Sequence, residues 1–194
     1  MFDLESILES RDPRAGSTRV IGIDGHGGSG KSTLAEYLSE QLTAGIVHTD
    51  DFASWDNPKD WWPLLIERIF EPLTSGVRTL SYPRSQWWPG HKPEAVVDQP
   101  VTAVLILEGV GSLRREFRPF LSVAIFVGAT RRVCIERGTT RDAAMGTREA
   151  ILERWNSWFD DELGYMARDE PEQFADIIID GTVPFENQIF QRLR

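Results

Sequence analysis

Residues 25–32 read Gly-His-Gly-Gly-Ser-Gly-Lys-Ser, in which a glycine is followed by four residues and then by Gly-Lys-Ser. Small residues here let consecutive backbone N–H groups turn toward an anion, and a helix that follows presents its positive end to the same anion. Lys31 can reach the outer phosphates of a nucleotide, and the Ser32 hydroxyl can bind Mg²⁺. The pattern predicts a phosphate-binding loop (the P-loop) that holds ATP or another nucleoside triphosphate with Gly25, Gly27, Gly28, Ser29, Gly30, Lys31, Ser32 and Thr33.

The segments around this loop predict the fold. An apolar run at 20–23 precedes the loop, and apolar residues recur at helical spacing over 34–42. Helical patterns separate further continuous apolar runs, which are typical of strands buried on both faces of a parallel sheet. These runs lie at 45–47, 101–107, 123–127 and 175–179. We therefore expect an α/β P-loop NTPase fold, a three-layer sandwich with a mostly parallel sheet of about five strands.

The length of 194 residues fits a single domain over 1–194. Helical spacing of apolar residues near the start predicts a leading helix within 1–15 that docks on the domain. Two stretches, 50–60 and 81–100, do not follow the strand–helix alternation and are rich in proline and aromatic residues. We expect both to be long irregular loops, which in a compact domain are usually either functional or disordered.

Composition excludes several classes of protein. The formal net charge of −9 argues against a surface built to coat nucleic acid or anionic lipid. The single cysteine, Cys134, excludes an internal disulfide and a thiolate metal cluster, so any metal is expected to be bound by oxygen. The sequence has neither a signal-peptide pattern nor an 18-residue apolar run. We expect a cytoplasmic protein without nucleic-acid or membrane partners, either monomeric or homodimeric.

The order of the motifs resembles the uridine kinase and phosphoribulokinase group of P-loop kinases. The likeness runs through 22–35, His48-Thr49-Asp50-Asp51-Phe52, Ile106-Leu107-Glu108-Gly109 and 175–179, and it spans about residues 18–182. The resemblance implies a kinase that transfers the γ-phosphate of ATP to a hydroxyl of a small molecule, with uridine or a related nucleoside as the first candidate. Another sugar-like or vitamin-like alcohol is an alternative acceptor, and an NTPase switch that transfers phosphate only to water is an alternative function.

The resemblance also implies roles for acidic residues. Asp50 would accept the proton of the acceptor hydroxyl and could help to hold Mg²⁺. Asp51 is the alternative base, although adjacent aspartates after a strand can instead form a turn or a helix cap. Glu108 ends an apolar run, where it could bind Mg²⁺ together with Ser32 and Asp50 or could be a surface charge at the end of a strand.

Residues 131–148 form an arginine-rich segment in an acidic chain, with five arginines against two acidic residues. Such a segment fits a candidate lid over bound phosphates, and we select Arg137 and Arg141 as catalytic candidates. For each arginine, a solvated helix face is the alternative. Tyr82, Arg84 and His91 are candidate acceptor-binding residues beside Asp50, whereas nearby tryptophans are more often packing residues than a platform for stacking a substrate.

Overall fold

The computed structural model of the chain describes residues 4–54, 57, 60–84, 95–184 and 191–192. Its main sheet is six-stranded and has the order β2-β5-β1-β6-β7-β8. The pairs among the first five strands are parallel, and β8 pairs antiparallel to β7 at the edge. The strands are β1 (Arg19–Asp24), β2 (Gly45–His48), β5 (Val104–Glu108), β6 (Leu121–Gly128), β7 (Ile177–Asp180) and β8 (Gln191–Arg192).

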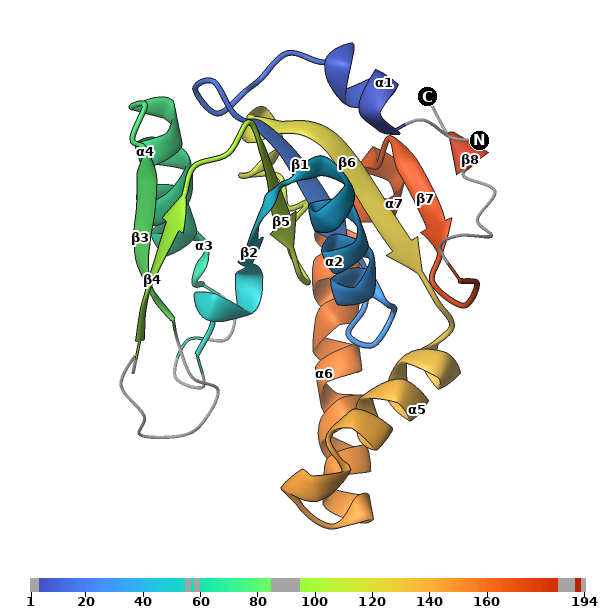
Figure 1. The fold of residues 1–194 in the computed structure, drawn as a ribbon. Helices are drawn as coiled ribbons and strands as arrows, with labels where there is room; N and C mark the ends of the chain where they lie inside the picture. The colour runs from blue at the N-terminus through green and yellow to red at the C-terminus, as the bar shows by residue number, and fades with distance from the viewer. Residues whose placement is uncertain (1–3, 55–56, 58–59, 85–94, 185–190, 193–194) are drawn as a thin grey trace.

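Helices cover both faces of this sheet, which confirms the predicted three-layer α/β architecture (Figure 1). On one face, Ile21 and Ile23 of β1 pack with Leu34 of α2 (Lys31–Leu42) and Leu8 of α1 (Leu4–Glu9). α1 lies within the 1–15 range in which the sequence predicts a leading helix, and its Leu8 is buried in this cluster. Because residues on both sides of each central strand are buried, the strands read as continuous apolar runs.

The opposite face carries a larger apolar cluster. Val20 of β1 lies in it, together with residues of the helical run α3 (Trp62–Leu65), a π-helical turn (Ile66–Phe70) and α4 (Glu71–Thr74). The short helix α7 (Pro171–Phe174) contributes Phe174. Aromatic rings pack among aliphatic side chains in this layer, and Phe70 stacks on Phe120 at 4.3 Å between ring centroids.

Residues 79–100 contain a β-hairpin, so the prediction of an irregular segment over 81–100 is wrong for its strands. β3 (Thr79–Arg84) pairs antiparallel with β4 (Ala95–Pro100). Leu80 and Tyr82 are buried against the core while Ser81 is exposed, which is the alternation of a half-buried strand. Prolines are tolerated because both strands of a two-stranded sheet are edge strands, and their presence hid the alternation.

The candidate lid consists of helix α5 (Arg131–Arg141), a 3₁₀ turn (Ala143–Met145) and the start of α6 (Arg148–Asp169). Thr130 and Thr147 cap the two helices with their side chains. In Figure 1, α5 leaves the end of β6 and meets α6 at the far end of an arm. Gly138 lets the helices approach, because a Cβ there would lie 2.3 Å from the ring of Trp155. In the described part of the chain, no helix is long and apolar enough to cross a membrane.

Candidate active site

The P-loop joins β1 to α2 and has the backbone that an anion site requires. Gly28 has a φ of +79°, and a Cβ there would lie 2.4 Å from the carbonyl oxygen of Cys134 in α5, so only glycine fits. Gly30 precedes α2 and has no side chain to cap it, which leaves the N–H groups of the first helical turn available to a ligand. The buried hydroxyl of Ser29 has no hydrogen-bond partner among the described residues. These features fit a bound nucleotide phosphate.

Lys31 is folded back onto the loop that precedes it. Its ammonium group donates a hydrogen bond to the carbonyl oxygen of His26 over 2.9 Å, and the side chain is almost fully buried. The same carbonyl oxygen accepts the N–H of Ser29 at 3.0 Å. The positive charge of Lys31 is therefore held inside the ring of the loop, where phosphate oxygens bind in P-loop proteins.

Asp24, the last residue of β1, is a fully buried acid at the base of the loop. Its carboxylate accepts hydrogen bonds from the N–H groups of Gly25, Gly111 and Leu113 and from the hydroxyl of Tyr165. Burial raises the pKa of this carboxyl above its usual value, although these bonds and Lys31 act in the opposite direction. Asp24 thus ties the P-loop to the loop after β5 and to α6.

The strand register brings Glu108 next to the P-loop. Glu108, at the end of β5, is paired with His48 of β2 on one side and with Ile23 of β1 on the other. Ser32 donates its hydroxyl hydrogen to Glu108 Oε1 at 3.2 Å, and His48 Nδ1 lies 2.7 Å from Glu108 Oε2. The structure therefore brings the side chains of Ser32 and Glu108 together, while their role as metal ligands stays a prediction.

Electrostatics keeps Glu108 in its charged form. Burial alone would raise the pKa of the Glu108 carboxyl, but the hydrogen bond from His48 and the charge of Lys31 outweigh burial and hold the pKa below its usual value. The hydrogen bond to Glu108 in turn raises the pKa of His48. A charged Glu108 beside the Ser32 hydroxyl offers two oxygen ligands of the kind that Mg²⁺ prefers.

Few protein ligands would surround a metal here. Within the described ranges, no group of three or more His, Cys, Asp or Glu side chains could hold a metal ion. Mg²⁺ typically binds to one or two protein oxygens while water and substrate phosphates complete its shell. Ser32, Glu108 and Asp50 fit that mode, in which Mg²⁺ supplies charge neutralisation for the phosphates.

Asp50 and Asp51 point to different surroundings although they are adjacent in the 3₁₀ turn Thr49–Asp51 that follows β2. Asp51 is buried, and its Oδ1 accepts a hydrogen bond from Nε of Arg84 at 2.9 Å. Its Oδ2 is buried without a partner among the described residues. Asp50 is exposed. The two aspartates therefore cannot share one role.

The charge environment links Asp50 to the other predicted site residues. Asp50 reaches the surface, but neighbouring protein atoms displace much of the water around its carboxyl. This desolvation raises the pKa of Asp50. Glu108 raises the pKa further, whereas the positive charges of Lys31, His48 and Arg141 lower it. The carboxyl of Asp50 is thus influenced by the charges of Lys31, Glu108 and Arg141. A carboxylate with a raised pKa is a stronger base than an ordinary aspartate.

Arg137 and Arg141 lie on the P-loop side of α5. Nη1 of Arg137 donates to the carbonyl oxygens of Gly181 at 2.9 Å and of Ser29 at 3.3 Å. Nε of Arg141 donates to Asp142 at 2.8 Å, and its guanidinium carbon lies 5.2 Å from the centre of the Trp155 ring. Arg137 thus holds backbone of the loop, whereas the side chain of Arg141 is exposed and is bound to Asp142.

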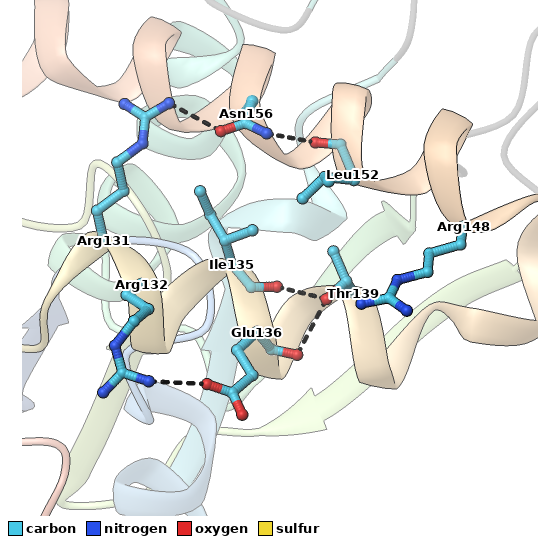
Figure 2. A pocket seen from close by; sticks show the side chains of 8 residues that line it. All are labelled: Arg131, Arg132, Ile135, Glu136, Thr139, Arg148, Leu152 and Asn156. Atoms are coloured by element: carbon cyan, nitrogen blue, oxygen red, sulfur yellow. Dashed lines mark hydrogen bonds and ion pairs between the residues drawn. The ribbon is translucent and has the colours of Figure 1, made fainter.

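The other lid arginines line a different surface. An open groove of about 590 Å³ lies between α5 and α6 (Figure 2). Arg131 pairs with Asp160 at 2.6 Å, and Arg132 pairs with Glu136 at 3.3 Å. The groove residues are Arg131, Arg132, Ile135, Glu136, Thr139, Arg148, Leu152 and Asn156. Because none of the candidate site residues lines it, the groove is separate from the active site.

The predicted acceptor residues are only partly in view. Tyr82 is buried and stacks on Phe52 with 5.2 Å between ring centroids, and burial raises its pKa to about 12. Arg84 is half-exposed beside Asp51. His91 lies outside the described residues. The acceptor-binding roles of Tyr82, Arg84 and His91 therefore remain predictions.

Sequence reasoning missed several residues that touch the site. Asp24 could have been found, because a carboxylate that ends an apolar strand directly before a glycine loop needs hydrogen-bond partners. Glu162 of α6, which binds the loop at Gly27, gave no signal among the other acidic residues of its helix. The pairing of His48 with Glu108 depends on strand register, which the sequence does not specify.

Known proteins resemble the chain in sequence. No protein-family model matches it. A uridine-cytidine kinase D from Dictyostelium discoideum is 30% identical over 130 residues, which cover 62% of this chain and 25% of that protein. A uridine kinase from Tolumonas auensis is 24% identical over 185 residues, covering 82% of this chain and 85% of that protein. The chain thus spans only about a quarter of the Dictyostelium relative but most of the Tolumonas relative.

The fold of the chain also resembles that of a solved structure. A solved structure described as a possible uridine kinase from Bacillus stearothermophilus superposes with a TM-score of 0.60 at 20% identity, covering 91% of this chain and 99% of that chain. This likeness shows a shared fold, and the curated relatives show a shared sequence pattern. Sequence and fold together confirm the resemblance of the chain to the uridine kinase and phosphoribulokinase group of P-loop kinases.

Proposed function

We propose that the chain is a Mg²⁺-dependent kinase that transfers the γ-phosphate of ATP to a hydroxyl of a small molecule, with a uridine-like nucleoside as the first candidate acceptor. The arrangement of Ser32, Glu108 and Asp50 beside the P-loop carries this proposal. The names of the relatives, uridine kinase and uridine-cytidine kinase, support the choice of acceptor.

In this proposal each residue has a separate task. Lys31 would leave the His26 carbonyl and bind the outer phosphate oxygens, and Ser32 and Glu108 would hold Mg²⁺, which would neutralise charge on the phosphates. Asp50 takes the proton from the acceptor hydroxyl while the oxygen of that hydroxyl bonds to the γ-phosphorus. The bond between the γ-phosphorus and ADP breaks in the same step. Arg141 stabilises the charge on the transferring group.

The raised pKa of Asp50 favours this role, since a base is most effective when its pKa approaches the working pH. The buried Asp51 pairs with Arg84 and has no comparable access to an acceptor. We therefore assign Asp50 as the base and Asp51 to the wall of the acceptor site.

A screen for ADP release across nucleosides, sugars and other small alcohols tests the proposal. We expect ADP to form in step with one class of acceptor and the phosphorylated acceptor to be visible by mass spectrometry. The Lys31→Ala variant serves as the inactive control. ADP release at the same rate with and without every acceptor would instead identify an NTPase that transfers phosphate to water.

A further inference from the structure

A carboxylate from α6 occupies part of the P-loop. The N–H of Gly27 donates to both carboxylate oxygens of Glu162, at 3.2 Å each. A Cβ at Gly27 would lie 3.1 Å from Glu162 Oε1, so the two groups are in close contact. Gly27 belongs to the glycine pattern predicted to turn its N–H groups toward phosphate. An internal anion therefore binds where an anionic ligand is expected.

Glu162 is held firmly in this position. His26 Nδ1 lies 2.7 Å from Glu162 Oε2, and both side chains are about five-sixths buried, at 16% and 15% exposed. The imidazole of His26 stacks on Phe159, with 4.1 Å between ring centroids. Phe159 and Glu162 are three residues apart on α6 and so share one face of the helix. The contact is thus part of a packed interface.

The charge of Glu162 affects any nucleotide that enters the loop. A carboxylate a few ångströms from the phosphates repels them, and this repulsion grows with the negative charge of the ligand. Metal-free ATP carries two more negative charges than its Mg²⁺ complex. Glu162 therefore opposes metal-free ATP more strongly than Mg-ATP.

We propose that Glu162 is a specificity-determining residue of the nucleotide site, which makes the P-loop select the Mg²⁺ complex of ATP over metal-free ATP. This inference rests on the nucleotide site proposed above. Glu162 belongs neither to the P-loop nor to the candidate lid, and it is not one of the candidate metal ligands.

Calorimetric titration with ATP tests it, in excess MgCl₂ and separately in EDTA, at one pH and ionic strength. Glu162→Gln keeps the shape and the hydrogen-bond acceptor but removes the charge. We expect it to bind metal-free ATP about tenfold more tightly than the unmodified protein does, with a smaller gain for Mg-ATP. The preference of Glu162→Gln for Mg-ATP over metal-free ATP should therefore be smaller than that of the unmodified protein.

Two variants control this experiment. Glu153→Gln makes the same charge change on an exposed part of α6, about 14 Å away along the helix, where salt screens its effect. Glu162→Asp keeps the charge beside the loop. Both should retain the preference for Mg-ATP shown by the unmodified protein, and thermal melting establishes that each variant is folded.

The outcomes separate this inference from the proposed function. If Glu162→Gln keeps the same preference as Glu153→Gln, or binds both forms of ATP more weakly, Glu162 does not select the metal complex and the inference is wrong. If neither the unmodified protein nor Glu162→Gln binds ATP in either buffer, the nucleotide site itself is wrong. Binding by the unmodified protein with a reduced preference in Glu162→Gln alone supports both.

Discussion

The indole N–H of Trp155 donates a hydrogen bond to the carboxylate of Asp142 over 2.9 Å, and both side chains are buried. The second oxygen of the same carboxylate accepts the Nε hydrogen of Arg141. Asp142 therefore connects the packed interior of the candidate lid to the arginine at its surface. The Nη groups of Arg141 are not part of this contact.

This pair predicts a measurable coupling. Trp155→Phe keeps an aromatic ring but leaves one Asp142 oxygen without its donor, which should lower the free energy of unfolding by about 1–3 kcal/mol in urea denaturation. In an Asp142→Ala background the same substitution should cost less. An equal cost in both backgrounds would mean that ring packing alone explains the effect.

Lys31→Ala should remove most phosphoryl transfer, by about a hundredfold or more, while the protein stays folded. Among the described residues, the ammonium group donates a hydrogen bond to the loop carbonyl of His26, and Lys31 is not a member of the apolar clusters of the core. Steady-state ADP release and thermal melting on the same sample check both parts. Near-normal turnover by a folded variant would contradict the assignment of the P-loop.

The two neighbouring aspartates should respond differently to removal of charge. Asp50→Asn should lower turnover about a hundredfold with little change in melting temperature, because Asp50 is exposed and is the proposed base. Asp51→Asn should chiefly lower stability, because it removes the charge of a buried carboxylate from its part-buried pair with Arg84. Turnover at saturating Mg²⁺ and urea denaturation of both variants provide the comparison, and the reverse pattern would move the base to Asp51.

Asp24 should make stability depend on pH. Burial raises the pKa of Asp24 in the folded protein above the ordinary 3.8. At a pH between 3.8 and the raised pKa, the folded state therefore binds more protons than the unfolded state. The contribution of Asp24 to the free energy of unfolding therefore falls as pH rises through that window. Urea denaturation of the unmodified protein and of Asp24→Asn across this pH range isolates the effect. A difference that grows with pH would show that the hydrogen bonds to Asp24 outweigh its burial.

The sequence predicted those parts of the fold that local patterns determine. The five parallel strands were recognisable because their residues are buried on both faces, as Val20 and Ile21 of β1 illustrate. The P-loop was recognisable because few sequences permit its backbone, as the contact between Gly28 and Cys134 shows. The hairpin was missed because Pro83 and Pro100 interrupt its alternation.

The candidate site was predicted less completely, because much of it depends on contacts between distant residues. Glu162 lies 135 residues from Gly27 along the chain, and no local pattern indicates that the two meet. The inward turn of Asp51 toward Arg84 likewise depends on where the hairpin packs. Asp50 was selected through the family resemblance and Glu108 because it ends an apolar run, and the register of β2 and β5 pairs Glu108 with His48, two residues before Asp50.

The absent side chain of Gly138 has a mechanical consequence for the candidate lid. Because the Trp155 ring fills the space over this glycine, a shift of α5 against α6 would require this ring to leave that space, so we expect the two helices to be displaced together. Further along α6, Phe159 stacks on His26 and Glu162 accepts the N–H of Gly27. We therefore expect a displacement of the turn between α5 and α6 to reach the P-loop through the contacts of Phe159 and Glu162.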